Sequence, residues 1–153
     1  VATYDLRPAM SAVEVTDRLV DAITSGTFDF LLVNYANGDM VGHTGSLPAA
    51  IAACETVDAC LARVLDAAAP SGTVVLVTAD HGNCEVMVDP ETGEPHTAHT
   101  TNPVPFTIVN APAGTRLRDG GILADVAPTV LGVLGIALPS EMSGRDLRLP
   151  LES

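Results

Sequence analysis

Four histidines, two of them in close Asp/His pairs, are the residues of this chain whose types and spacing favour chemistry. Asp39 and His43 are four residues apart, and Asp80 and His81 are adjacent. Imidazole and carboxylate form the mixed ligand set that Mn, Zn and Fe accept in proteins. A histidine on a surface or in a core needs no such neighbours. The pattern therefore predicts a metal-dependent site, binuclear and suited to phosphate.

The same residues have plainer interpretations. Asp39 could be a turn residue or a helix N-cap, and Asp80 could cap the segment after it, with His81 incidental. Glycines near Asp39 and His43 make a regular helix doubtful, but a turn would also let both side chains reach one ion. His96 and His99 compete for a third ligand position, with the other as an outer or surface group.

A nucleophile is harder to find than metal ligands. The chain has seven serines, of which Ser11 and Ser46 resemble helix caps and most others flank turns. It has no P-loop and no dinucleotide-binding fingerprint. Cys84 trails the second Asp–His pair, where a small, partly buried residue is favoured over a ligand. The sequence thus predicts metal ligands without a catalytic residue.

Buried strands are needed to position the Asp–His pairs. Continuous apolar runs directly precede both pairs, and helical patterns alternate with them, which predicts right-handed crossovers and an α/β fold. We expect a mainly parallel sheet with helices on both faces, and ligands bind such sheets at the carboxyl ends of the strands. The expected strands span residues 28–35, 73–78, 86–88 and 103–109, the helices 11–26 (opened by a capping box), 47–69 and 125–135, and a hairpin-type turn 89–93.

Length and composition indicate one compact globular domain. The chain has 153 residues, 47% hydrophobic and 17% charged. Its net charge of −12, with no basic cluster, disfavours nucleic acid and anionic membranes as partners. The odd number of cysteines without CxxC spacing indicates free thiols in a reducing compartment. Without a spanning apolar stretch or signal peptide, we expect a cytoplasmic protein.

Three segments resemble the C-terminal part of the 2,3-bisphosphoglycerate-independent phosphoglycerate mutases, a family within the alkaline phosphatase superfamily. They are Asn34–Gly45, Thr78–Asn83 and His96–Pro105. The Asp-His-Gly motif is shared by the whole superfamily, whereas the first and third segments are far more specific. The resemblance runs over essentially the whole chain and implies an alkaline-phosphatase-like fold, of which this chain would carry part.

The resemblance also implies roles for single residues. Asp39, His43 and His99 would hold one Mn²⁺, and Asp80 and His81 would contribute to a second, with Zn²⁺ or another divalent ion possible. Full-length members interconvert 3-phosphoglycerate and 2-phosphoglycerate through a phosphoserine. Their serine, the N-terminal strands and an inserted transferase domain do not match any segment of this chain.

The resulting expectation is that residues 1–153 form the C-terminal portion of a metal-binding phosphatase-type domain of a glycolytic isomerase. Alone it would be inactive, and an unpaired sheet edge would favour self-association. Two alternatives remain open: a phosphopentomutase or other phosphohydrolase of the same superfamily, and a metal-binding module that does not catalyse. The His96–Pro105 segment argues against the first alternative.

Overall fold

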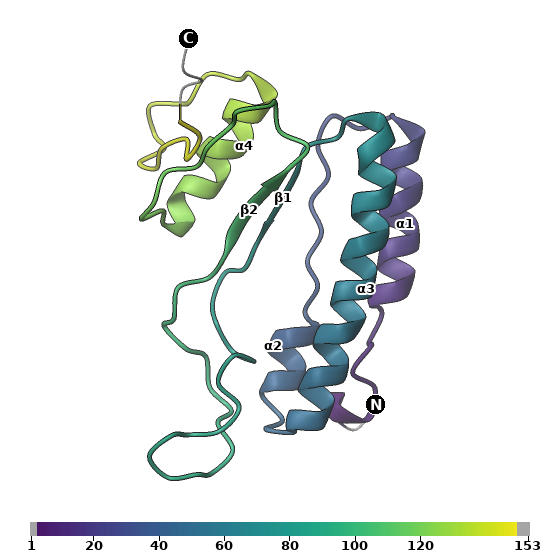
Figure 1. The fold of residues 1–153 in the computed structure, drawn as a ribbon, viewed down its shortest axis with the longest axis vertical. Coiled ribbons are helices and arrows are strands. Elements are labelled where there is room, and N and C mark those ends of the chain that lie inside the picture. The colour runs from purple at the N-terminus through teal and green to yellow at the C-terminus, as the bar shows by residue number, and fades with distance from the viewer. Residues whose placement is uncertain (1–2, 150–153) are drawn as a thin grey trace. The chain divides into compact units, whose positions relative to one another are not determined.

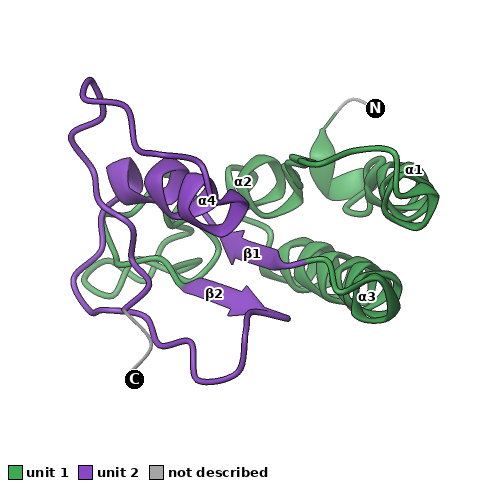
Figure 2. Ribbon diagram, turned by 90° about the horizontal axis from the view of Figure 1, so that it is seen from above, with its two compact units in different colours: residues 1–73, 81–105 green, residues 74–80, 106–153 purple. Residues whose placement is uncertain are grey.

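A computed structural model describes residues 3–149 of the chain, which fold into two compact units (Figure 2). The first unit contains residues 1–73 and 81–105, and the second contains residues 74–80 and 106–153. Helices dominate the first unit, and the second combines a helix with a small sheet. Along the chain the elements are η1 Tyr4–Leu6, α1 Ala12–Ser25, α2 Asn37–Gly42, α3 Leu47–Ser71, β1 Val75–Thr78, β2 Phe106–Val109, η2 Leu123–Asp125 and α4 Val126–Leu134 (Figure 1).

The helices α1 and α3 of the first unit pack side by side (Figure 1). Both were predicted from their hydrophobic spacing, and both end at a glycine: Gly26 and Gly72 adopt φ angles of 60° and 67°, the left-handed region that glycine enters without a Cβ clash. The predicted capping box of α1 is wrong, because Ser11 makes no side-chain cap hydrogen bond. Its backbone, with φ −112° and ψ 21°, is not in the extended conformation usual for an N-cap.

The short helix α2 forms where a turn was predicted. Its two glycines each cost a helix about 1 kcal/mol relative to alanine. Tertiary contacts outweigh that cost: the buried Asn37 donates its side-chain amide to the carbonyls of Pro8 and Ala9 at 2.8 and 3.0 Å. Val41 is fully buried in a core cluster with Ala49, Ala50, Ala53 and Met87. Local propensity alone therefore misjudged this segment.

The segment from Phe28 to Tyr35 is extended but forms no strand within the described residues (Figure 1). It was predicted to be buried on both faces, yet Phe28, Phe30 and Leu32 are 61%, 54% and 86% exposed. Leu31 between them is partly covered, as expected when successive side chains point to opposite sides. The prediction of a doubly buried strand is therefore wrong for the described chain, because no neighbouring strand there covers the outer face.

The two described strands pair antiparallel, where a mainly parallel sheet was predicted. β1 pairs with β2 from Val75 opposite Val109 to Thr78 opposite Phe106. Both strands lie in runs predicted to be strands, so the α/β class stands. This pair does not show the predicted parallel direction. Apolar runs resemble one another whichever way the neighbouring strands run, so the sequence did not reveal the direction of this pair. Their side chains are partly buried or exposed, not buried on both faces.

The predicted final helix is found as η2 and α4, and a left-handed glycine ends it. Buried Asp125 accepts hydrogen bonds from the backbone N–H groups of Ile122 at 2.9 Å and Arg145 at 2.8 Å. The Thr129 hydroxyl donates to the Asp125 carbonyl at 2.7 Å and accepts from the Leu147 N–H at 2.9 Å. These bonds fasten the C-terminal tail to α4.

The predicted turn at residues 89–93 is present. The Asp89 carboxylate accepts hydrogen bonds from the N–H groups of Glu91 and Thr92 at 2.8 and 2.9 Å. Such a bond to the backbone two residues on defines an Asx-turn. The preceding segment 86–88 was predicted to be a short strand and contributes a single bridge, opposite Pro95.

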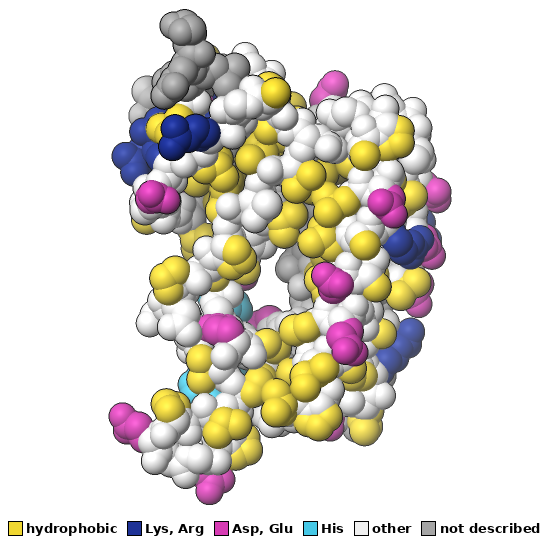
Figure 3. All heavy atoms as spheres, viewed as in Figure 1, with side chains coloured by type: hydrophobic (Ala, Val, Ile, Leu, Met, Phe, Trp, Pro, Cys, Tyr) yellow, Lys and Arg dark blue, Asp and Glu magenta, His cyan; other side chains and the backbone are white. Residues whose placement is uncertain are grey.

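Acidic side chains are dispersed over the visible face of the molecule and separated by exposed hydrophobic ones (Figure 3). The described helices include none with the length and apolar character needed to cross a membrane.

Candidate metal centre

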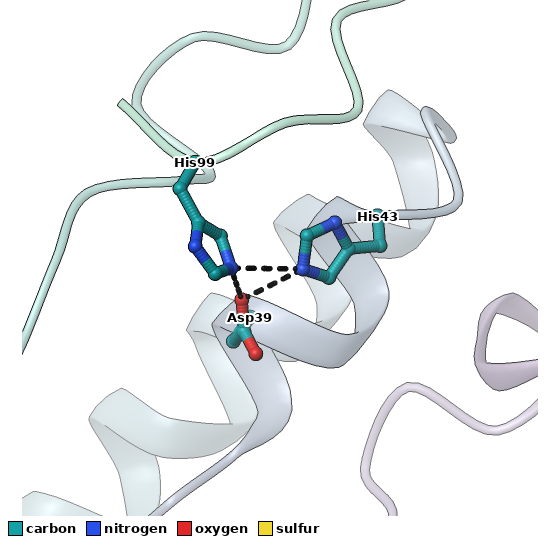
Figure 4. Close-up of side chains that lie close together, drawn as sticks. All are labelled: Asp39, His43 and His99. Atoms are coloured by element: carbon teal, nitrogen blue, oxygen red, sulfur yellow. Dashed lines mark hydrogen bonds and ion pairs between the residues drawn. The ribbon is translucent and has the colours of Figure 1, made fainter. Parts of the chain in front are cut away.

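Asp39 lies on α2, and His43 is the C-cap residue directly after it, one helical turn from Asp39, so the two side chains project on the same side (Figure 4). The Oδ1 atom of Asp39 is 3.1 Å from Nε2 of His43. The two side chains therefore converge as predicted, on a helix and not on a turn.

His99 joins them from a loop far along the chain (Figure 4). Its Nε2 lies 2.9 Å from Asp39 Oδ1 and 3.0 Å from His43 Nε2. Among residues 3–149, these three side chains form the group of metal-ligating type whose donor atoms come close together. The Asp39, His43 and His99 side chains are 34%, 39% and 48% exposed, which leaves the open side accessible to further ligands.

The separations of the three donor atoms fit a single ion. Ligand atoms that each lie about 2.1 Å from one ion are roughly 3.0–3.4 Å from one another. The three distances here are 2.9, 3.0 and 3.1 Å. An arrangement in which three electron-rich atoms face one point is stable only when they share a proton or a cation, because the atoms otherwise repel one another. One carboxylate and two imidazoles suit a divalent transition metal better than Mg²⁺ or Ca²⁺, which prefer oxygen.

A backbone carbonyl orients His43. Its Nδ1 lies 2.6 Å from the carbonyl oxygen of Thr97. A carbonyl only accepts hydrogen bonds, so Nδ1 carries the proton, and the lone pair of the neutral ring is on Nε2. That lone pair faces Asp39 and His99, and this is how metal-ligating histidines are usually held.

The side chain of Asn83 orients Asp39. Its side-chain amide donates to Asp39 Oδ1 at 3.0 Å and to the Asp39 carbonyl at 3.3 Å. Burial acts to raise the pKa of Asp39, but this hydrogen bond together with His43 and His99 outweighs burial, so the net pKa lies below its ordinary value of 3.8. The carboxylate is therefore ionised at neutral pH and available as a ligand.

His81 lies beside this cluster, whereas Asp80 belongs to the second unit. The His81 ring stacks on His99 with centroids 3.7 Å apart and planes 21° from parallel. Its Nε2 is 3.9 Å from Asp39 Oδ1. Asp80 is exposed in the second unit. The structure thus brings together four of the five predicted ligands in one unit.

His96 is outside the cluster and is half-buried. Its Nδ1 is buried and has no hydrogen-bond partner among the described residues, while its backbone N–H bonds the Met87 carbonyl at 3.0 Å. Of the two histidines that competed for the third position, His99 is the one that reaches Asp39.

A group of hydrogen-bonded residues beside the cluster was missed by sequence reasoning. Glu85, Thr100 and Asn102 form a hydrogen-bonded group next to His99. The hydrogen bond from Thr100 is the largest cause that lowers the pKa of Glu85. Two features of the sequence could have indicated this group: an acidic residue four positions after His81, and a Thr/Asn run directly after His99.

Neither a thiol nor a serine completes the site within the described residues. Cys84 is partly buried and donates to the Gly38 carbonyl, and burial raises the pKa of its thiol to about 11. The prediction of a small, partly buried residue is confirmed, as are free thiols at all three cysteines. None of the described serines hydrogen-bonds to Asp39, His43 or His99.

Comparison with known proteins finds relatives over nearly the whole chain. A family model described as the metalloenzyme superfamily matches residues 1–138. The 2,3-bisphosphoglycerate-independent phosphoglycerate mutase of Cereibacter sphaeroides is 62% identical over 96% of this chain, and that of Chloroflexus aggregans is 61% identical over 96%. The chain spans 29% and 28% of the length of these two relatives.

A solved structure is also similar. A Leishmania mexicana phosphoglycerate mutase, crystallised at low cobalt concentration, aligns with a TM-score of 0.87 and 32% sequence identity. The alignment covers 96% of this chain and 30% of the Leishmania chain.

Proposed function

This chain belongs to the metalloenzyme superfamily, and we propose that Asp39, His43 and His99 bind one divalent metal ion. The observation that carries the proposal is the convergence of Asp39 Oδ1, His43 Nε2 and His99 Nε2 at 2.9–3.1 Å from one another. The tautomer imposed on His43 by the Thr97 carbonyl supports it. Mn²⁺ is the ion we favour, and Zn²⁺ and Co²⁺ accept the same ligands.

A second ion is proposed, with Asp80 and His81 among its ligands. Support comes from the position of His81, whose ring stacks on His99. The strand β1 ends at Thr78, two residues before Asp80, and polar side chains at the end of a strand are well placed for ligands. Two protein ligands bind an ion weakly, so this site needs donors from outside the chain.

For the whole protein we propose the interconversion of 3-phosphoglycerate and 2-phosphoglycerate in the cytoplasm. The support is the 60–62% identity to proteins named as 2,3-bisphosphoglycerate-independent phosphoglycerate mutases. In this proposal the reaction passes through a phosphoserine, and the serine lies outside the present chain. The mainly parallel sheet would likewise involve strands beyond the described residues.

The residues of this chain would prepare the site and not attack the substrate. A bound divalent ion supplies Lewis acidity towards phosphoryl oxygens and lowers the pKa of a coordinated hydroxyl. Asp39 contributes the negative charge that offsets part of the ionic charge. The Thr97 carbonyl keeps His43 in the tautomer that a ligand needs, and Asn83 keeps Asp39 turned towards the histidines.

The metal proposal is tested by calorimetric titration of the purified chain with Mn²⁺. We expect one appreciable site and a second much weaker one, because three ligands converge on the first. Binding should fade below about pH 6, since imidazole must be neutral to bind a metal ion and histidine protonates in that range. Two equally tight sites, or no binding, would contradict the proposal.

The activity proposal is tested with the product of the complete reading frame, assayed on 3-phosphoglycerate and on ribose 5-phosphate. We expect turnover of phosphoglycerate. The Asp39→Ala variant should lose it, and the control Asp58→Ala, which changes an exposed residue of α3, should keep it. Turnover of only the pentose phosphate would favour a phosphopentomutase. The 153-residue chain alone is expected to show neither activity.

A further inference from the structure

Glu85 connects two loops that carry residues of the candidate metal centre, although its own carboxylate is outside the cluster. Its Oε2 accepts a hydrogen bond from the backbone N–H of Asn83 at 2.7 Å. Its Oε1 accepts from the Thr100 hydroxyl and from the Asn102 amide, the latter at 3.1 Å. One carboxylate thus joins segments that are 15 residues apart in the sequence.

Both ends of this connection lead directly to a candidate ligand. Thr100 follows His99 in the chain, so fixing Thr100 restricts where the His99 ring can lie. Asn83 donates its side-chain amide to Asp39 Oδ1 at 3.0 Å. Glu85 is therefore the shared partner of the two residues that border Asp39 and His99.

Close packing around Gly82 shows that the connection has little freedom to shift. A Cβ atom at Gly82 would collide with Glu85 Oε1 and with the Thr100 hydroxyl oxygen. The Thr100 N–H also bonds the Gly82 carbonyl at 2.9 Å. The two loops are thus held by a backbone bond and by the side-chain bonds of Glu85 at the same place.

We propose that Glu85 is a positioning residue of the metal centre, whose carboxylate sets the separation of Asp39 and His99. Hydrogen bonds to a carboxylate are roughly twice as strong as neutral ones, which suits Glu85 to this role. The inference rests on the proposed metal site and adds a residue that acts through Thr100 and Asn83 and not by binding the ion.

The test is a titration of the purified chain with Co²⁺, followed by visible absorption, in Glu85→Gln, Thr100→Val and the double variant. Each single change should weaken Co²⁺ binding roughly 10- to 100-fold, the usual cost of losing an outer-shell partner. It should also alter the Co²⁺ absorption band, because His99 moves. The double variant should lose less affinity than the sum of the two single losses, because both changes act on the connection between Glu85 and Thr100. Thr100→Ser keeps the hydroxyl and should bind like the unchanged chain.

A second readout is independent of metal. Amide hydrogen exchange at Thr100 should be faster in Glu85→Gln, because the backbone bond to Gly82 loses its neighbour. If a folded Glu85→Gln or Thr100→Val chain binds Co²⁺ with unchanged affinity and an unchanged absorption band, the positioning role of Glu85 is wrong, even if the melting temperature is lowered. The proposed metal site would still stand in that case. If the unchanged chain binds no Co²⁺, the proposed metal site fails, and the inference fails with it.

Discussion

Nδ1 of His43 lies 2.6 Å from the carbonyl oxygen of Thr97, a residue 54 positions further along the chain. The bond ties helix α2 to the loop that carries His99. Because the acceptor is a backbone atom, side-chain replacement at Thr97 leaves the acceptor in place. The orientation of His43 therefore depends on the path of the loop, and the same path brings His99 to Asp39.

Replacing His99 should abolish the metal site, whereas replacing His96 should not. His99 Nε2 is 2.9 Å from Asp39 Oδ1, and His96 is outside the cluster. We expect His99→Ala to weaken Mn²⁺ binding by more than roughly 100-fold, since even outer-shell changes cost 10- to 100-fold. Calorimetric titration of both variants measures this. Loss of the ion in His96→Ala with retention in His99→Ala would reverse the assignment.

Alanine at the two glycines of α2 should have opposite effects. A Cβ at Gly42 would meet Asn83 Cγ at 2.7 Å, so Gly42→Ala should displace Asn83 from Asp39 and destabilise the chain. At Gly38 a Cβ would meet only Cys84 Sγ, at 4.0 Å. Gly38→Ala should therefore be neutral or stabilise by up to about 1 kcal/mol, the helix preference of alanine over glycine. Urea unfolding curves give the free energy of unfolding of each variant. An equal change in both variants would argue against a specific role for Asn83.

Asp125 should make stability depend on pH. Hydrogen bonds from the Ile122 and Arg145 N–H groups lower its pKa below the ordinary value of 3.8. A group whose pKa is lower in the folded chain stabilises above its unfolded pKa, about 3.9, and loses that contribution as pH falls through the folded value. Asp125→Asn should therefore lower the melting temperature at pH 7 and have a smaller effect near pH 2.

The matched control is Asp119→Asn, which changes an exposed acid in the same unit. Its melting temperature should follow that of the unchanged chain across the pH range. An Asp125→Asn effect of the same size at pH 7 and pH 2 would show that the group acts by its shape and not by its charge.

The chain should self-associate through the extended segment at residues 28–35. Phe28, Phe30 and Leu32 are exposed on it, and exposed apolar side chains on extended backbone favour association. Sedimentation velocity should show oligomers that decrease in Phe30→Ser/Leu32→Ser. The control, Leu6→Ser, removes an exposed leucine from η1 and should change little. A monodisperse monomer that binds no hydrophobic dye would refute this prediction.

Local patterns in the sequence were enough to locate most of the helices. Hydrophobic spacing located α1, α3 and α4, because each helix buries one side and ends at a glycine that tolerates a left-handed backbone. The Asp-Pro-Glu-Thr-Gly turn was also predicted, since an aspartate that bonds its own backbone needs no distant partner. These features depend on neighbours along the chain.

Features that depend on distant neighbours were predicted poorly. The helical state of Asn37–Gly42 depends on Val41 packing against α3, and propensity alone opposed it. The pairing of β1 with β2 joins segments about thirty residues apart, and composition carries no information on its direction.

For the candidate site, the sequence by itself determined which side chains are available: a carboxylate and imidazoles at Asp39, His43, Asp80, His81 and His99. Only the tertiary structure decided that His99, 60 residues from Asp39, lies 2.9 Å from it and that His96 does not. It also revealed the supporting bonds from Asn83, Glu85 and the Thr97 carbonyl. The reason is physical: ligand type is a property of single residues, whereas donor atoms 3 Å apart require the folded backbone to bring separate loops together.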